Sequence, residues 1–234
     1  MSGFPLLTSL VLLALTSIHA GGQAVSDKSW ATEFPVEKGE LAANGRNPYF
    51  ILEPGYQLVL EGGRERLTIT VKDEIWMIAG VETRLVEEYE TQAGQVVEVS
   101  RNYFAISKRT NDLFYFGEDV DIYARGKVVA HDGAWLAGVK GATFGLMMPG
   151  QPQLKMRYYQ EIAPGVAMDR VEVVGLGETV KTPAGEFKNC LKTEETTPLE
   201  PGDIAHKYYA PGIGLVQSDS LKLVKYGKVQ ASTK

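Results

Sequence analysis

The chain has 234 residues, 44% hydrophobic and 23% charged, a composition that fits one globular domain better than a disordered chain, a collagen-like repeat or a large multidomain enzyme. Lys and Arg number 24 against 29 Asp and Glu, for a net charge of −5, and no basic cluster exceeds a pair. Nucleic acid is therefore excluded as an expected partner. Three histidines and one cysteine exclude cysteine-rich structural zinc sites and an intrachain disulfide framework.

An uncharged apolar run, FPLLTSLVLLALTSI, occupies residues 4–18 and is followed by small residues. The run is shorter than the roughly 20 apolar residues of a membrane-spanning helix and is typical of a cleaved signal peptide. Cleavage after Ala20 or after Ala24 fits the small-residue rule, and an uncleaved anchor is the alternative, because no Lys or Arg precedes the run. We expect a signal peptide at 1–20, export to a periplasm or the medium, and no stable membrane span in the mature chain.

Three regions follow the predicted signal peptide. Residues 21–46 are rich in glycine, alanine and polar side chains without a sustained period, which is typical of a linker, and Trp30 and Phe34 are its candidates for docking. From 47 to 226, short β-branched and aromatic runs alternate with turn signals, which indicates one antiparallel β domain. Residues 227–234 form a C-terminal tail.

The strand pattern is clear where Leu67, Ile69 and Val71 alternate with threonines, because successive side chains of a strand face opposite sides of a sheet. One face is then buried and the other faces water. Similar runs occupy 57–60, 81–91, 95–107, 113–116, 120–123, 127–131, 155–162, 168–174, 186–193, 205–209 and 221–226. Glycine, which supplies the positive φ of tight hairpin turns, occurs in the connections at 62–63, 79–80, 93–94, 125–126 and 132–133.

About a dozen antiparallel strands cannot stay in one flat sheet, because twist accumulates and long edges invite aggregation. We expect an all-β fold, a single antiparallel meander strongly curved into a half-barrel or barrel, with two packed layers as the alternative. One long stretch, residues 133–153, lacks the strand pattern and is rich in glycine and methionine. A loop of this length inside a compact domain is usually functional or a packed lid.

Several longer segments carry a family resemblance. They are NPYFILEPGYQLVLEG, YFGEDVDIY, GKVVAHDGAWLAGVKGA, GLMMPG, YYQEIAPGVAMDRVEVV, TPAGEFKNCLKTEETTPLEP and KYYAPGIGLV. Together they resemble a group of exported bacterial β-rich proteins of unknown function, over most of residues 47–226. The ending also resembles the curved-sheet lipoprotein carriers of the bacterial envelope. The resemblance implies an exported bacterial β protein and transfers no catalytic residues.

The densest acidic segment places Asp119 and Asp121 on one side of an extended strand and Glu118 on the other. Two carboxylates on one side can share a hard cation such as calcium, which takes about six to eight oxygen ligands, so further acids must join them. The metal candidates are Glu118, Asp119, Asp121, Glu161 and Asp169. The alternative is a solvated acidic face, and the EF-hand pattern is absent. We expect no cofactor, with calcium as the alternative.

A curved sheet that lines its concave face with aromatic rings and methionines encloses an apolar cavity with a few polar tips, as ligand sites generally have. The residues expected to contact a ligand are Trp135, Met147, Met148, His131 and Tyr159. His131 stands at the start of the glycine-rich stretch, and histidine suits proton transfer near neutral pH. The alternative is a hydrogen-bonded turn histidine that packs on Trp135.

Cys190 admits two placements. Strict alternation puts its side chain beside Lys188 and Lys192, whose ammonium groups would make the thiol reactive. A bulge at Lys188 or Asn189 would instead turn the thiol inward with Phe187. We favour burial, because free cysteine is among the most buried residue types.

No G-x-S-x-G, H-E-x-x-H, G-x-x-x-x-G-K-[ST] or G-x-G-x-x-G string occurs, so we lean towards binding rather than catalysis. The first hypothesis is an exported binding module that holds a small apolar or amphiphilic molecule, or an envelope protein, under the stretch at 133–153. The second hypothesis is a carboxylate- or metal-dependent hydrolase or lyase that uses Glu118, Asp119, Asp121, Glu161 and His131. The third hypothesis is an envelope structural or interaction protein without a pocket.

Overall fold

The computed structural model describes residues 30–229, and the predicted signal peptide lies outside them. A short 3-10 helix, η2 (Lys38–Glu40), precedes the strands of this part of the chain. The strands are β1 (Leu41–Ala42), β2 (Gly45–Asn47), β3 (Phe50–Leu52), β4 (Tyr56–Gly62), β5 (Glu65–Ile78), β6 (Val81–Gln92), β7 (Gln95–Ser107), β8 (Leu113–Ala124), β9 (Lys127–Ala130), β10 (Trp135–Leu136), β11 (Thr143–Met148), β12 (Arg157–Tyr159), β13 (Glu161–Ile162), β14 (Arg170–Thr182), β15 (Gly185–Thr196), β16 (Ala205–Ala210), β17 (Gly214–Ser218) and β18 (Leu221–Lys228).

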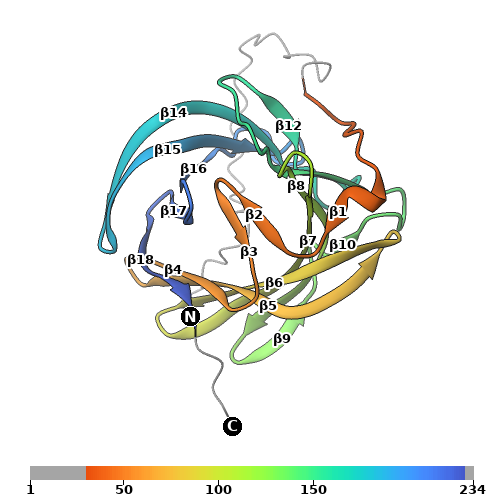
Figure 1. Cartoon of the computed structure of the whole chain (residues 1–234). Coiled ribbons are helices and arrows are strands. Elements are labelled where there is room, and N and C mark those ends of the chain that lie inside the picture. Colours follow the sequence, from red (N-terminus) through yellow and green to blue (C-terminus); the bar gives the residue numbers. More distant parts are fainter. Residues whose placement is uncertain (1–29, 230–234) are drawn as a thin grey trace, which may run out of the picture.

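The predicted all-β, strongly curved fold is confirmed. One antiparallel sheet runs in the order β12-β14-β15-β16-β17-β18-β4-β5-β6-β7-β8-β11-β13, with β1 on β7 and with β9 and β10 on β8. The end strands β12 and β13 are separated in the chain only by Gln160, so the two edges of the sheet come together in a nearly closed barrel (Figure 1). Two series of consecutive hairpins meet where β18 pairs with β4.

The glycine-containing hairpin connections have the backbone expected of them. Ala79 and Gly80 have φ angles of 50° and 77°, and Ala93 and Gly94 have 52° and 78°. Two successive residues at positive φ match the right-handed twist of the flanking strands, which is why such turns join long hairpins. These turns connect β5 to β6 and β6 to β7, two of the longest strand pairs in the described chain.

Gly117 joins the two predicted runs 113–116 and 120–123 into the single strand β8. The pairing of β7 with β8 shifts at this glycine, and its φ is 156°. An added Cβ would lie 2.8 Å from the Trp135 carbonyl oxygen, so only glycine lets β10 approach β8 this closely. The shift changes which residues face inward: Glu118 does so on one side of the bulge and Tyr115 on the other.

The hairpin of β2 and β3 crosses one end of the barrel, and in Figure 1 it lies in the middle of the ring of strands. Asn47, 1% exposed, donates hydrogen bonds to backbone carbonyls of Asn111, Met148 and Pro149. On the opposite side, the Gly212 amide donates to the carbonyl oxygen of Pro48 at 2.7 Å. Contacts to both walls hold the hairpin as a plug.

Two segments expected to be irregular pack against the barrel. In the predicted linker, the Trp30 ring lies 6.4 Å from that of Tyr159, and the Phe34 ring lies 6.3 Å from that of Phe114. The stretch 133–153, expected to lack strands, contains β10 and β11. Both strands pair with β8, and their backbones supply hydrogen-bond partners to the edge of β8 that β7 leaves free.

Cys190 is fully buried, as favoured from its residue type, with 0% exposure. Asn189 has a φ of 56°, and the register of β14 and β15 shifts between the Glu178 and Val180 pairs, which is the bulge that turns the thiol inward. Phe187 joins it in the core at 8% exposure. Burial raises the pKa of the Cys190 thiol, which keeps it protonated and unreactive.

Candidate functional site

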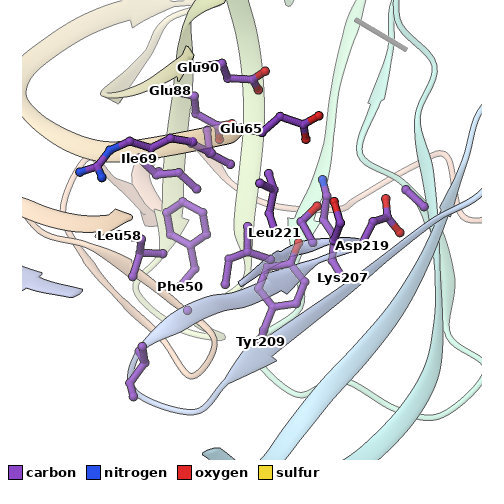
Figure 2. Close-up of a pocket in the computed structure, with 18 of the residues that line it drawn as sticks. Phe50, Leu58, Glu65, Ile69, Glu88, Glu90, Lys207, Tyr209, Asp219 and Leu221 are labelled. Atoms are coloured by element: carbon purple, nitrogen blue, oxygen red, sulfur yellow. The ribbon is translucent and has the colours of Figure 1, made fainter. Parts of the chain in front are cut away.

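The barrel encloses a cavity of about 380 Å³ above the β2–β3 plug. Its apolar wall includes Phe50 from the plug and Leu58 and Ile69 from β4 and β5. The polar part of the wall, which begins next to Ile69, carries Glu88, Glu90, Glu65, Lys207, Tyr209 and Asp219 (Figure 2). The lining includes Glu65 and Gln92, the strand residues next to the β4–β5 and β6–β7 turns, and Asp219 and Ser220 in the β17–β18 turn, so the cavity extends to the barrel end opposite the plug.

Strand register explains how glutamates come to face an apolar wall. Residues directly opposite each other on paired strands point to the same face of a sheet. Ile69 lies opposite Glu88, and Leu67 lies opposite Glu90, so the buried face of β5 continues into the acidic face of β6. Glu90 in turn lies opposite Glu98 on β7. The inner face of the sheet therefore changes from apolar to acidic within two strands.

A second cavity of about 320 Å³ lies next to the first, and Glu90 borders both. Its wall carries Glu98, Glu118, Asp169 and Glu200. The two cavities together give the barrel interior one apolar region and one region rich in carboxyl groups.

The inner carboxyl groups hold their protons unusually tightly. Burial first, then the charges of Glu98 and Glu88, raises the pKa of Glu90 to about 8. Burial and the charge of Glu88 raise the pKa of Glu98 to about 7. Burial and the charges of Glu88 and Glu98 also raise the pKa of Glu118 to about 8, against the opposing hydrogen bonds of Tyr115 and Ser100. Near neutral pH these three groups are therefore poised between their protonated and ionised forms.

Lys207 on β16 is paired with Glu195 on β15, with Nζ 2.6 Å from Oε2. Burial lowers the pKa of Lys207, but the charge of Glu195 and neighbouring groups outweighs this, and the net pKa is raised well above its usual range. Burial and Glu195 also raise the pKa of Tyr209. Lys207 therefore stays positively charged and forms an ion pair with Glu195.

Glu161 and Asp169 form a second pair of inner acids. The backbone amide of Asp169 donates to Oε1 of Glu161 at 2.6 Å. Burial, then the charge of Asp169, raises the pKa of Glu161 well above its usual range. Burial and the charge of Glu195 raise the pKa of Asp169 to about 6. Glu118 acts on Glu161 as well, so these acids belong to the same electrostatic cluster.

Asp119 and Asp121 alternate with the inner residues of β8 and face outward. Both guanidinium nitrogens Nη1 and Nη2 of Arg101 lie 3.0 Å from Oδ2 of Asp121, and Nδ1 of His131 lies 3.1 Å from its Oδ1. The Tyr103 hydroxyl donates to Asp119 at 2.6 Å. These two aspartates are thus already paired on the outer surface.

The sheet therefore divides the five predicted metal ligands between its two faces. Glu118, Glu161 and Asp169 lie inside, whereas Asp119 and Asp121 lie outside. Among residues 30–229, no group of three or more His, Cys, Asp or Glu side chains is arranged as a metal site. The hydrolase hypothesis needs these acids and His131 to lie together. The sheet separates them in the same way, because His131 lies with Asp121 on the outer face.

Of the five predicted ligand contacts, Met147 lines the larger cavity. Met148 is 1% exposed and belongs to the hydrophobic core, and Tyr159 is 2% exposed beneath Trp30. Trp135 is 6% exposed with its ring 5.2 Å from that of Tyr115, and its Nε1 has no hydrogen-bond partner among the described residues. The side chain of His131 is 67% exposed on the outer face.

Sequence reasoning missed Glu88, Glu90, Glu98 and Lys207, which are the groups that give the cavity its charge. The signal available for Glu88 and Glu90 is their spacing of two in a predicted strand, which places both on one face. Glutamates on a strand usually face water, so residue type alone points this face to the outside.

Searches of protein-family models, curated proteins and solved structures found no match to this chain. Within residues 30–229, none of the helical structure has the length and hydropathy needed to cross a membrane.

Proposed function

We propose that this protein is an exported binding protein whose barrel interior holds a small amphiphilic molecule. The observation that carries the proposal is the cavity of about 380 Å³, which falls within the range of about 300–1,000 Å³ typical of ligand pockets. An apolar wall with a few placed polar groups is the usual composition of such sites. The apolar run at residues 4–18 supports export.

The shape of the interior supports an elongated ligand. The plug supplies Phe50 and Ile51 to the cavity wall at one end, and Glu65, Asp203 and Asp219 line it at the other. An amphiphile inserted tail first would bury its apolar part against the plug and leave its polar end towards the carboxyl groups. Burial of apolar area, at about 25 cal/mol per Å², would supply much of the affinity.

Binding can be tested with Nile red, an uncharged dye that fluoresces in apolar surroundings, and with octanol as a competitor. We expect saturable binding of one dye molecule per chain and its displacement by octanol. Ile69→Trp fills the cavity from β5 and should weaken dye binding about tenfold or more. Thr68→Trp adds the same ring to the other face of the same strand and should leave binding within about twofold of the native protein.

Near-ultraviolet circular dichroism reports whether each variant keeps its packed core, and Leu58→Phe offers a smaller filling substitution if Ile69→Trp unfolds. Absence of saturable dye binding by the folded native protein would overturn the proposal. Equal loss of binding in Ile69→Trp and Thr68→Trp would also contradict it, because the dye would then bind outside the barrel. The exposed side chains of Ile75 and Trp76 on β5 make that outcome physically accessible.

A further inference from the structure

The acidic part of the interior contains far more carboxyl groups than cations. Lys207 is a cation whose charge acts on Glu88, Glu90 and Asp169. Its Nζ atom lies 2.6 Å from a Glu195 oxygen, so one carboxylate already takes its charge. Within residues 30–229, Glu88, Glu90, Glu98 and Glu118 form no ion pair, and Arg66, which also lines the cavity, is paired with Glu61.

Like charges directly opposite each other across two strands destabilise a sheet. Glu90 and Glu98 occupy such a pair, and Glu88 lies two residues before Glu90 on the same face of β6. Burial first, then the charges of Glu98 and Glu88, raises the pKa of Glu90 to about 8, and burial with the charge of Glu88 raises the pKa of Glu98 to about 7. A positive charge placed between these groups would therefore be stabilised by all of them.

A second feature of the interior also points to a missing partner. The Tyr158 hydroxyl and Oε1 of Glu195 have no hydrogen-bond partner among the described residues, and Tyr158 is 1% exposed. Register aligns Tyr158 with Val171, then Glu195, then Ala205, so the row faces inward, with Ala205 in the wall of the larger cavity and Tyr158 and Glu195 packed behind that wall. A buried polar group without a hydrogen bond is destabilising, so native structures rarely leave one without a role.

We propose that the barrel ligand is an amphiphilic primary amine, whose ammonium group lies between Glu88 and Glu90 and whose chain lies along Leu58 and Ile69. This inference rests on the proposed binding function and names the class of ligand. An ammonium group carries three N–H donors and one positive charge, so it supplies both the hydrogen bonds and the charge that the acidic wall lacks. The apolar wall contacts the alkyl chain. A small inorganic cation lacks these contacts and should therefore bind more weakly than the amphiphile.

Head-group chemistry separates this ligand from other amphiphiles of the same length. A carboxylate head group would add another negative charge to the cluster and should be repelled. An alcohol would gain the apolar contacts and one hydrogen bond from its hydroxyl, but no charge to offset that of the cluster. The structure therefore orders the three head groups as ammonium, then alcohol, then carboxylate.

Displacement of Nile red by octylammonium, octanol and octanoate tests this order at about pH 8. We expect octylammonium to bind about tenfold or more tightly than octanol, and octanoate to bind most weakly. Equal affinity of octylammonium and octanol would overturn the amine inference and leave the binding function standing. Failure of all three ligands and of the dye would instead overturn the binding function itself.

Charge-removing variants locate the head group. Glu88→Gln combined with Glu90→Gln should reduce the ratio of octanol to octylammonium dissociation constants about tenfold. Glu87→Gln is the matched control, because Glu87 lies between them on β6, pairs with Lys72 outside the barrel, and should leave the ratio unchanged. An unchanged ratio in the double variant, with its circular dichroism spectrum preserved, would contradict the proposed head-group position.

The preference for octylammonium should increase from about pH 6 to about pH 8.5, because a bound cation favours ionised carboxyl groups and octylammonium stays charged over this range. A ratio that does not change with pH would contradict the role of the carboxyl cluster. The titratable or charged groups that line the two cavities or act on the acidic cluster are Tyr56 on β4, Glu65 and Arg66 on β5, Glu88 and Glu90 on β6, Glu98 on β7, Tyr115 and Glu118 on β8, Tyr158 on β12, Glu161 on β13, Asp169 before β14, Glu195 on β15, Lys207 and Tyr209 on β16, and Asp132, Glu200, Asp203 and Asp219 in loops.

Discussion

Replacement of Glu118 by glutamine tests whether the barrel interior is stabilised by protons on its carboxyl groups. Burial and the charges of Glu88 and Glu98 raise the pKa of Glu118 from 4.5 to about 8. The folded state therefore binds this proton more tightly than the unfolded state. Its contribution to stability is complete below about pH 4.5 and is lost as the pH rises through about 8.

The structure also bounds the size of this effect. One pKa unit corresponds to about 1.4 kcal/mol, so the difference between 4.5 and about 8 gives an upper limit of roughly 5 kcal/mol for ionising Glu118 in the fold. The side chain borders a cavity that water can enter, which screens its charge, so we expect about 1–3 kcal/mol. Glutamine keeps the shape of the protonated acid and removes the ionisation.

Urea unfolding of the native protein and Glu118→Gln, at about pH 5 and about pH 8.5, measures the effect. The variant should match the native protein within about 1 kcal/mol at the lower pH and exceed it by about 1–3 kcal/mol at the higher pH. Glu82→Gln, on the exposed face of β6, is the control and should show the same small difference at both values. A Glu118→Gln protein destabilised equally at both pH values would refute the reasoning, because its carboxyl would then matter only for hydrogen bonding.

Two further predictions concern the plug and the barrel wall. Asn47→Ala removes the donor shared by three backbone carbonyls and should lower the free energy of unfolding by about 1–3 kcal/mol in urea titrations, whereas the exposed Asn44→Ala should change it by less than about 0.5 kcal/mol. Gly150→Ala places a Cβ on the carbonyl oxygen of Thr110 and should cost about 3 kcal/mol or more, measured in the same way. Gly39→Ala meets nothing within 4 Å and should be nearly neutral, and comparable losses in the two glycine variants would show that the close approach is not real.

The inner face of β5 around Leu67 and Ile69, and its continuation on β6, could be predicted from the sequence. A two-residue turn at 79–80 pairs odd-numbered residues of one strand with even-numbered residues of the next. The predicted burial of Leu67 and Ile69 therefore carries over to Glu88 and Glu90, and the structure has this pairing. The two strands keep this relation despite a register shift, because the shift preserves the odd-to-even pairing. Glutamates inside a barrel contradict the usual burial preference, which is why pairing is the better guide here.

The inner face of β7 and β8 could not be predicted in the same way. The register of β6 and β7 shifts by one residue between Glu90 and Thr91, so Glu98 lies opposite Glu90 where an unbroken hairpin would place Val97. A one-residue shift moves every later side chain of the strand to the other face. Gly117 adds a second shift in β8. Neither composition nor hydrophobic period marks where such a residue is inserted, so the carboxyl cluster becomes visible only in three dimensions.

Protonation and a bound ammonium group are two ways of removing the same repulsion among the inner carboxyl groups. At low pH the protons on Glu90, Glu98 and Glu118 make the interior neutral, and the apolar packing of the barrel is then opposed by little buried charge. At higher pH the same groups ionise, and the fold loses stability that a cationic ligand would restore by mass action. Amine binding and proton binding are therefore coupled through the same side chains. In the presence of octylammonium, the free energy of unfolding should depend less on pH, because the cluster that sets the head-group preference also causes the loss of stability at high pH.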